Sequence, residues 1–347
     1  PTGTGNVAVG DTALDSIESG ATNNVAIGSG AGTAITTGDY HTTVGYAAGA
    51  SVTTATNNTV IGALAGDALT EGNYNVVVGV NALTADTKGS YTTALGHGAL
   101  AAQNFTSATA SYNTAVGHAA GAAVTTGIQN TLIGALAGDG GNNTAVGYES
   151  LSSVCTGSYN TAVGRIAMRA MTSGTENTGL GNAALLVNTT GNNNTSVGSD
   201  SLKANVSGDN NTALGFEALQ AATASNNTAL GYQALLANTT GADHTIVGAF
   251  AGHGVTTGSG NTFLGKYAGY NTTTGHSNVF IGYRTNGEYG AGHLVTTGSK
   301  NTILGSYSGN QNSLDLRTSS NNIVLSDGDG NPRLSIDSTG RAYFNCG

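Results

Sequence analysis

A five-residue motif that ends in glycine recurs eighteen times along this chain, and most of its glycines lie 17 residues apart. A fixed period of this length is typical of a solenoid, in which each repeat forms one coil and buries its apolar side chains against its neighbours. The chain is therefore predicted to fold as a stack of coils rather than around one globular core. The recurrent glycines are Gly10, Gly28, Gly45, Gly62, Gly79, Gly96, Gly117, Gly134, Gly147, Gly164, Gly181, Gly198, Gly215, Gly231, Gly248, Gly265, Gly282 and Gly305.

The four positions before each glycine are patterned, and we name them as columns. The residue just before the glycine is Val, Ile or Leu in all eighteen repeats (the aliphatic column), and the second before it is most often Ala (the alanine column). The third is Thr fourteen times and Val four times (the threonine column), and the fourth is Asn fifteen times (the asparagine column). Because β-branched residues favour extended backbone, each motif predicts a short strand, stacked about 4.8 Å from the next.

Side chains alternate along a strand, so the threonine and aliphatic columns share one face and the asparagine and alanine columns share the other. The aliphatic column is expected to line the interior of the coil, and the alanine column to form a second packing face. The asparagine column is expected to form an amide ladder between coils. N-glycosylation of sequons such as Asn57-Asn58-Thr59 is the alternative reading.

The half of the repeat after the glycine is also patterned, with Ala three residues later in fourteen repeats and Leu or Gly four residues later in sixteen. This pattern predicts a second short strand and then a surface loop. The irregular steps between glycines, of 21, 13 and 23 residues, leave the motif intact and change only the length of that loop. Segments that tolerate insertions are expected at the surface.

Composition restricts the partners. The formal charge is -9 and no basic stripe is present, which argues against nucleic-acid binding. No apolar run is long enough to predict membrane insertion. A coil of about 17 residues that is rich in Ala and Gly encloses little apolar surface, so a second burial surface supplied by identical chains is predicted.

The unit from Asn227 to Leu235 resembles the repeats of phage tail-fibre proteins. It is also similar to the Ser-Val-Ala-Ile-Gly-type repeats in the heads of trimeric autotransporter adhesins. The resemblance covers residues 1–310, taken here as a β-solenoid shaft of about eighteen coils. It implies an all-β, parallel β-roll that assembles as a homotrimeric fibre.

Residues 311–347 are predicted to form a C-terminal β-meander or cap. The segment from Asn321 to Phe344 alternates strand-like runs with turns, and the Asp-Gly pairs at 327–330 are hairpin signals. The meander resembles the segment that precedes the self-cleaving chaperone domain of many phage tail fibres. A chaperone is expected to have been cleaved off or to lie beyond residue 347, and this likeness favours a phage fibre over an adhesin.

No catalytic residue, cofactor or metal site is predicted. Asp327, Asp329 and Asn331 begin like a calcium loop, but Pro332 and Ser338 stand where that loop needs Gly and Glu. A hairpin turn is the preferred interpretation.

Two less favoured activities stay open. Asp200 and Glu217 fall in one column of adjacent repeats, at a spacing like that of retaining glycosidases, so a polysaccharide depolymerase is one alternative. Repeated Thr-Thr pairs raise an ice-binding solenoid as another, although the pairs lie in loops of variable length.

The residue just after the glycine varies most (the variable column) and is often aromatic or basic. It is predicted to form a ligand-facing stripe for sugars or surface polymers, with ordinary packing between coils as the alternative. The stripe comprises Tyr46, His97, His118, Tyr148, Phe216, Tyr232, Lys266 and Tyr283, and Arg165 lies in the same column.

The sequence thus favours a non-enzymatic structural segment of a phage tail fibre, located in the virion. Identical chains would present a rigid rod that attaches to host-surface polysaccharide or protein by multivalent contact. A trimeric adhesin head or stalk on a bacterial surface is the alternative.

Overall fold

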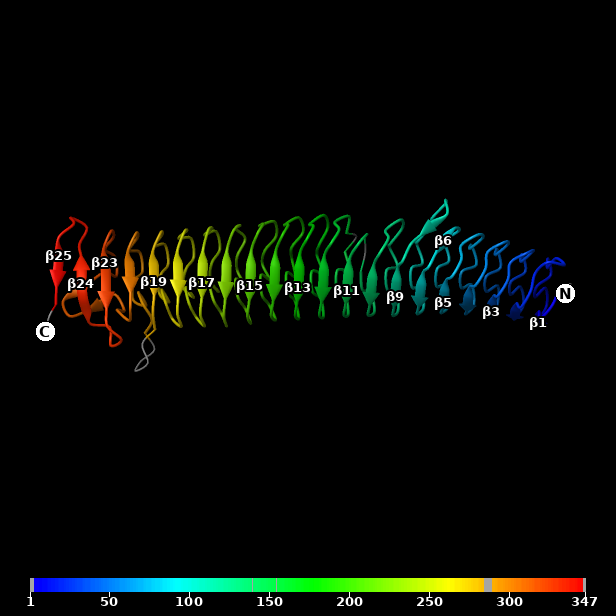
Figure 1. The fold of residues 1–347 in the computed structure, drawn as a ribbon, viewed down its shortest axis with the longest axis horizontal. Helices are drawn as coiled ribbons and strands as arrows, with labels where there is room; N and C mark the ends of the chain where they lie inside the picture. The colour runs from blue at the N-terminus through cyan, green and yellow to red at the C-terminus, as the bar shows by residue number, and fades with distance from the viewer. Residues whose placement is uncertain (1–2, 139, 154, 284–288, 346–347) are drawn as a thin grey trace. The chain divides into compact units, whose positions relative to one another are not determined.

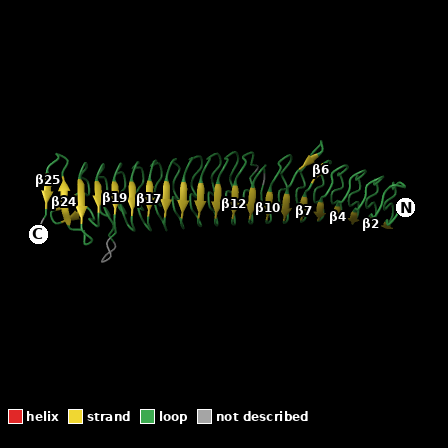
Figure 2. Cartoon of the chain, viewed as in Figure 1, coloured by secondary structure: helices red, strands yellow, loops and turns green. Residues whose placement is uncertain are grey.

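The computed structural model describes residues 3–138, 140–153, 155–283 and 289–345 as strands, turns and loops, with no helix in those ranges (Figure 1, Figure 2). The predicted all-β fold is confirmed as a parallel β-solenoid of about eighteen turns with a short antiparallel C-terminal region. The chain forms two compact units, Pro1–Ser173 and Gly174–Gly347.

In the first unit most repeats contribute one three-residue strand, and successive strands pair in parallel and in register. Thr42, Thr43 and Val44, for example, lie opposite Thr59, Val60 and Ile61. The two-residue strands β6 and β8 form a separate parallel pair, and β6 lies off the row of the other strands in Figure 1. The strands are β1 (Val7–Val9), β2 (Val25–Ile27), β3 (Thr42–Val44), β4 (Thr59–Ile61), β5 (Val76–Val78), β6 (Gly89–Ser90), β7 (Thr93–Leu95), β8 (Thr109–Ala110), β9 (Thr114–Val116), β10 (Thr131–Ile133), β11 (Thr144–Val146) and β12 (Thr161–Val163).

The second unit continues the same pattern and ends in an antiparallel meander. β23 pairs in parallel with β20, and β24 and β25 then add antiparallel strands, which confirms the predicted meander. The short β21–β22 hairpin was not predicted. The strands are β13 (Thr178–Leu180), β14 (Thr195–Val197), β15 (Thr212–Leu214), β16 (Thr228–Leu230), β17 (Thr245–Val247), β18 (Thr262–Leu264), β19 (Val279–Ile281), β20 (Thr302–Leu304), β21 (Asn310–Gln311), β22 (Leu314–Asp315), β23 (Ile323–Ser326), β24 (Pro332–Ile336) and β25 (Ala342–Phe344).

The prediction that the aliphatic column lines the interior of the coil is wrong. From Ala26 onward the alanine column is buried, whereas no member of the aliphatic column is buried. Leu95 and Leu214 are 43% and 42% exposed, while Ala94 and Ala213 beside them are 0% exposed. Alanine is the most frequent inward residue, but larger members of the same column, such as Phe263, are also 0% exposed, so size alone does not decide which face is inside.

The interior is filled by two further positions, four and seven residues after the repeat glycine. Where the fourth residue is Leu, as at Leu185, the seventh is often polar, as at Asn188; where the fourth is Gly, as at Gly49, the seventh is often aliphatic, as at Val52. Leu185, Asn188 and Val52 are all 0% exposed. One large apolar side chain at these two positions therefore fills many of the coils.

The predicted second strand is also wrong, because the segment after the glycine is a series of turns. The buried leucines four residues after the glycine have left-handed backbone, with φ of 52° at Leu83 and Leu185 and 56° at Leu235. A left-handed leucine costs roughly 1–2 kcal/mol in steric repulsion, which burial of its side chain offsets. Backbone bonds still join the coils here, as from the Leu185 N–H to the Ser201 carbonyl, 3.1 Å.

The predicted asparagine ladder is confirmed. The Asn58 side-chain carbonyl accepts the backbone N–H of Asn75 at 2.8 Å, and the Asn58 amide donates to the Gly72 carbonyl at 2.7 Å. The pattern recurs along both units, and Asn322 before β23 adds a further rung by donating its N–H to the Asn301 side chain. Each side chain thus satisfies backbone groups of its own coil and of the next.

Histidine replaces asparagine twice in this ladder, and each time Nδ1 accepts the backbone N–H of the next coil. In the first unit, His41 Nδ1 accepts the Asn58 N–H at 3.3 Å and Nε2 lies 2.7 Å from the Ala55 carbonyl, which makes Nε2 the donor. In the second unit, His244 Nδ1 accepts the Asn261 N–H at 3.2 Å. Both rings are therefore neutral in the ladder, because a protonated Nδ1 could not accept.

We expect acid to weaken the fold through these two rings. Burial lowers the pKa of His41 and of His244 below 6.5, against the opposing effects of backbone contacts and of Asp39 and Asp243 respectively. Below 6.5 the unfolded chain binds more protons than the folded chain, so this contribution is fully present above that pH and is lost as the pH falls. Unfolding midpoints measured from about pH 7 to pH 5 should fall.

The variant that carries His41→Asn and His244→Asn restores the common ladder residue and should show a flatter pH dependence. The exposed His276 is the control, and His276→Asn should leave the dependence as in the parent protein. An unchanged slope in the double variant would contradict this role for the two rings.

Candidate functional site

The outward face of the sheet recurs in every repeat. It carries the threonine and aliphatic columns, and neither column contains a charged residue in any of the eighteen repeats. In the first unit Ile27 and Ile133 are each 41% exposed, and in the second Leu180 and Leu264 are each 47% exposed. Each unit therefore presents a continuous apolar stripe, which we call the outer stripe.

The variable column lies beside this stripe, and every predicted residue of the ligand-facing stripe is exposed. Among the tyrosines of the predicted stripe, Tyr46 is the most exposed, at 63%, and Tyr148 is 47% exposed. The others are His97, His118, Phe216, Tyr232, Lys266 and Tyr283, with Arg165 exposed in the same column.

Several of these residues are brought together coil upon coil. His97 and His118 stack with ring centroids 5.3 Å apart, and Phe216 and Tyr232 stack at 5.4 Å. The Lys266 ammonium lies 5.8 Å from the centre of the Tyr283 ring. These stacks are packing between coils, which is the alternative to ligand binding for this column. A ligand-facing role stays a prediction.

Two aromatic groups were missed. The first is a tyrosine column five residues before the glycine, where Tyr74, Tyr91 and Tyr112 stack at 5.2 and 5.4 Å. The second is a cluster in the second unit around Phe250, Tyr267 and Tyr270. Extending the columns by one position on either side would have found the tyrosines and also Phe250 and Tyr267, which both lie two residues after the glycine. It would not have joined Tyr270 to them, because Tyr270 lies three positions further along the repeat.

The two carboxylates that suggested a depolymerase each bond to a different neighbouring side chain. Asp200 forms an ion pair with Lys203 at 2.9 Å, and Glu217 accepts a hydrogen bond from Gln233 at 2.7 Å. Each carboxylate therefore has its own local partner on the surface.

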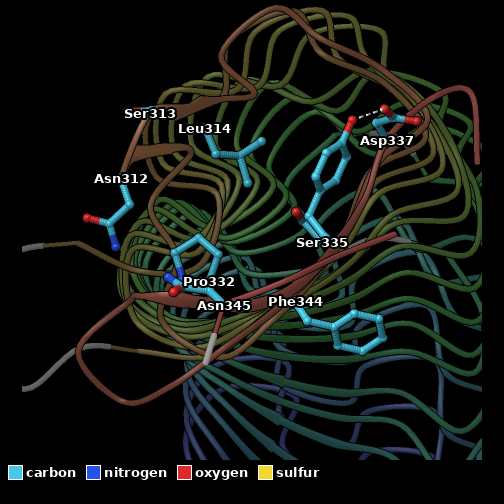
Figure 3. Close-up of a pocket in the computed structure, with 9 residues that line it drawn as sticks. Asn312, Ser313, Leu314, Pro332, Ser335, Asp337, Phe344 and Asn345 are labelled. Carbon is cyan, nitrogen blue, oxygen red and sulfur yellow. Dashed lines mark hydrogen bonds between the residues drawn. The ribbon is translucent and has the colours of Figure 1, made fainter. Parts of the chain in front are cut away.

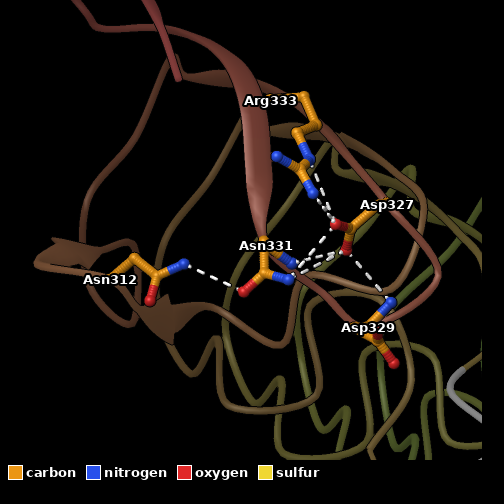
Figure 4. Close-up of polar contacts among 5 residues, drawn as sticks. All are labelled: Asn312, Asp327, Asp329, Asn331 and Arg333. Atoms are coloured by element: carbon orange, nitrogen blue, oxygen red, sulfur yellow. Dashed lines mark hydrogen bonds and ion pairs between the residues drawn. The ribbon is translucent and has the colours of Figure 1, made fainter. Parts of the chain in front are cut away.

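The calcium-like segment is a hairpin turn, as preferred (Figure 4). The Asp327 carboxylate accepts the backbone N–H groups of Asp329 and Asn331 at 3.0 and 2.9 Å, and it pairs with Arg333 at 2.6 Å. The Asn331 backbone contact comes first among the causes that lower the pKa of Asp327 to about 2. This carboxylate stabilises the turn between β23 and β24.

A hollow of about 480 Å³ lies at the C-terminal meander (Figure 3). Its lining includes Asp337, whose carboxylate accepts the Tyr343 hydroxyl at 3.0 Å, the Thr339 hydroxyl at 2.7 Å and two backbone N–H groups. These bonds, with that of Thr339 largest, lower the pKa of Asp337 to about 2. Asp337 thus stabilises the second turn of the meander.

Among the described side chains, no three His, Cys, Asp or Glu residues lie close enough together to hold a metal ion. Within the same ranges, no helix is long and apolar enough to span a bilayer. Comparison with known protein families, with curated proteins and with solved structures finds no match to this chain.

Proposed function

We propose that this chain is a structural segment of a homotrimeric attachment fibre, assembled through the outer stripe and without catalytic activity of its own. The observation that carries the proposal is the stripe itself, a run of half-exposed Val, Ile and Leu residues without any charge. Monomeric soluble proteins seldom expose contiguous apolar patches of more than a few hundred Å².

The size of the stripe fits an interface. The second unit alone carries eight aliphatic-column residues, from Leu180 to Leu304. The five leucines among them are 39–47% exposed. These five alone present on the order of 400 Å² before the other residues and the threonine methyl groups are counted, against ~800 Å² per partner in a standard interface. Because the stripe repeats with every coil, identical chains can align their coils and cover one another along its length.

The biological setting rests on the resemblance of the repeats to phage tail fibres and trimeric adhesin heads. The trimer, the location in a virion tail and the attachment of host polysaccharide or protein are parts of this proposal, and a bacterial surface adhesin is the second candidate. Immunogold electron microscopy distinguishes the two, because label on phage tails supports the fibre and label on bacterial surfaces supports the adhesin.

The assembly is tested by placing charge in the stripe. Leu214→Asp with Leu230→Asp puts two carboxylates at outward positions that are 42% and 39% exposed in the single chain. The fold should persist in circular dichroism, while the mass by analytical ultracentrifugation should fall from three times the 34.1-kDa chain to that of one chain. The trimer should dissociate because burying an unpaired charge costs several kcal/mol per interface.

Thr240→Asp is the control, since Thr240 is exposed outside the outer stripe and the same charge there should leave the mass unchanged. A parent protein that sediments as a folded monomer at every concentration would refute the assembly.

A further inference from the structure

Five aromatic side chains from three neighbouring coils of the second unit line one hollow of about 450 Å³. They are Phe250, Tyr267, Tyr270, Tyr289 and His293. Small-molecule sites typically measure about 300–1,000 Å³ and combine apolar walls with a few polar groups. The rings supply the walls here, and three phenol hydroxyls and an imidazole supply the polar groups.

The rings form two columns that meet at an angle. Phe250 and Tyr267 stack at 5.2 Å with 9° between their planes, and Tyr270 and His293 stack at 5.1 Å with 7°. Between the columns, Tyr267 and Tyr270 meet edge to face at 5.5 Å and 75°. The stack of Phe250 on Tyr267 follows from the repeat, whereas the stack of Tyr270 on His293 and the crossing of the two columns do not. The crossing makes the surface concave.

Tyr289 completes the hollow from outside the regular repeat. It lies within the 23-residue step between Gly282 and Gly305, where extra residues have been inserted. Its ring stands at 87° to that of His293 with centroids 4.8 Å apart, and it is 43% exposed. His293 is 8% exposed, so the hollow has one buried polar wall and one open aromatic wall.

The positive charge of Lys266 beside the hollow restricts the class of ligand that can bind there. The Lys266 ammonium lies 4.9 Å from the centre of the Tyr267 ring and already occupies the cation-binding position over it. A second cation would be repelled there, so a quaternary ammonium group does not fit. A ligand with apolar C–H faces and hydroxyl groups suits ring faces that carry phenol and imidazole groups at their edges.

We propose that this hollow binds a sugar ring of a saccharide, with its C–H face against the aromatic rings and its hydroxyls bonded to the tyrosine and histidine groups. The inference rests on the attachment function proposed above and names the ligand class for it. The predicted stripe leads into the site, because Phe216 stacks on Tyr232 and Tyr232 meets Phe250 at 5.1 Å. A longer saccharide could therefore lie along several coils.

The test uses the full chain and three saccharide probes: maltotriose, chitotriose and trigalacturonic acid. Saturation-transfer NMR and calorimetry should find saturable binding of at least one probe, with one site per chain. Tyr270→Leu and Tyr289→Ala should each weaken that binding about tenfold or more. Leucine occupies the Tyr270 position in other coils, at Leu186 and Leu236, so the solenoid should tolerate it.

Tyr91→Asn is the matched control, because Tyr91 is an exposed, stacked tyrosine of the first unit and asparagine occupies its column elsewhere, as at Asn57. Binding should survive this change. Absence of binding to all three probes at about 10 mM, an equal loss in Tyr91→Asn, or displacement of the saccharide by tetramethylammonium would overturn the proposal. The sedimentation mass is read separately, so loss of the saccharide site and loss of the trimer are distinguishable.

Discussion

Gly117→Ala is expected to destabilise the first unit by about 3–5 kcal/mol, an unusually large effect for one methyl group. Gly117 has φ of +135°, a conformation that L-residues rarely adopt. An added Cβ would also lie 2.6 Å from the carbonyl oxygen of Gly134 on the next coil, so the coils would have to separate. Chemical unfolding followed by circular dichroism should show the loss as a lower midpoint.

Two further glycines separate the effect of positive φ from the effect of close contact with the next coil. Gly98 has positive φ, +65°, but open space around its Cβ position, so Gly98→Ala should cost only about 1 kcal/mol. Gly20 has open space and no positive φ, so Gly20→Ala should stay within about 0.5 kcal/mol of the parent. Equal effects at all three positions would show that close stacking of the coils at the repeat glycine is not the constraint.

Asn58→Asp is expected to cost about 3 kcal/mol or more at neutral pH. Asn58 is 0% exposed, and its Nδ2 donates to the Gly72 carbonyl at 2.7 Å. Aspartate keeps the acceptor for the Asn75 N–H but places a second oxygen against that carbonyl and buries a charge. Thermal unfolding should show a large loss that becomes smaller in acid, where the carboxyl group is protonated.

The neighbouring Asn57→Asp makes the same chemical change at an exposed position and should leave the midpoint nearly unchanged. Similar losses in the two variants would mean that the asparagine ladder contributes little to the stability of the first unit.

The period, the position of the strands and the asparagine ladder could be predicted from the sequence because each depends on spacing alone. Strand register follows from the period, and the ladder follows from one amide recurring at one strand position. The two turns of the C-terminal meander could also be predicted, because Asp327 and Asp337 belong to local turns whose hydrogen bonds lie within a few residues.

The face of each strand that points into the coil could not be predicted. Both faces carry apolar residues, and alternation along the strand does not say which face is inside. The missing information lies outside the motif. Leu185 with Asn188, and Gly49 with Val52, show that side chains from the turn side of the coil share the interior with the inward strand position, which holds Ala in many coils and Phe at Phe263. The sequence did not reveal this arrangement, because the spacing of the leucines suggested a second strand, whereas their backbone is left-handed and forms turns.

The aromatic hollow could not be predicted either. Phe250 and Tyr267 share one repeat position and Tyr270 another, but Tyr289 and His293 belong to the lengthened step before Gly305. A column-by-column comparison detects residues that recur, and it overlooks a site completed by an insertion. The hollow is visible only once the coils are stacked.

Hydroxyl-radical footprinting of the intact protein, read out by mass spectrometry, tests the central claim most directly. In the single chain the outer-stripe residues Leu180 and Leu264 are each 47% exposed, whereas Leu185 and Leu219 are 0% exposed. If other copies of the chain cover the outer stripe, all four leucines should be oxidised equally slowly. Rapid oxidation of Leu180 and Leu264 beside protected Leu185 and Leu219 would show that the stripe faces water and would contradict the proposed fibre.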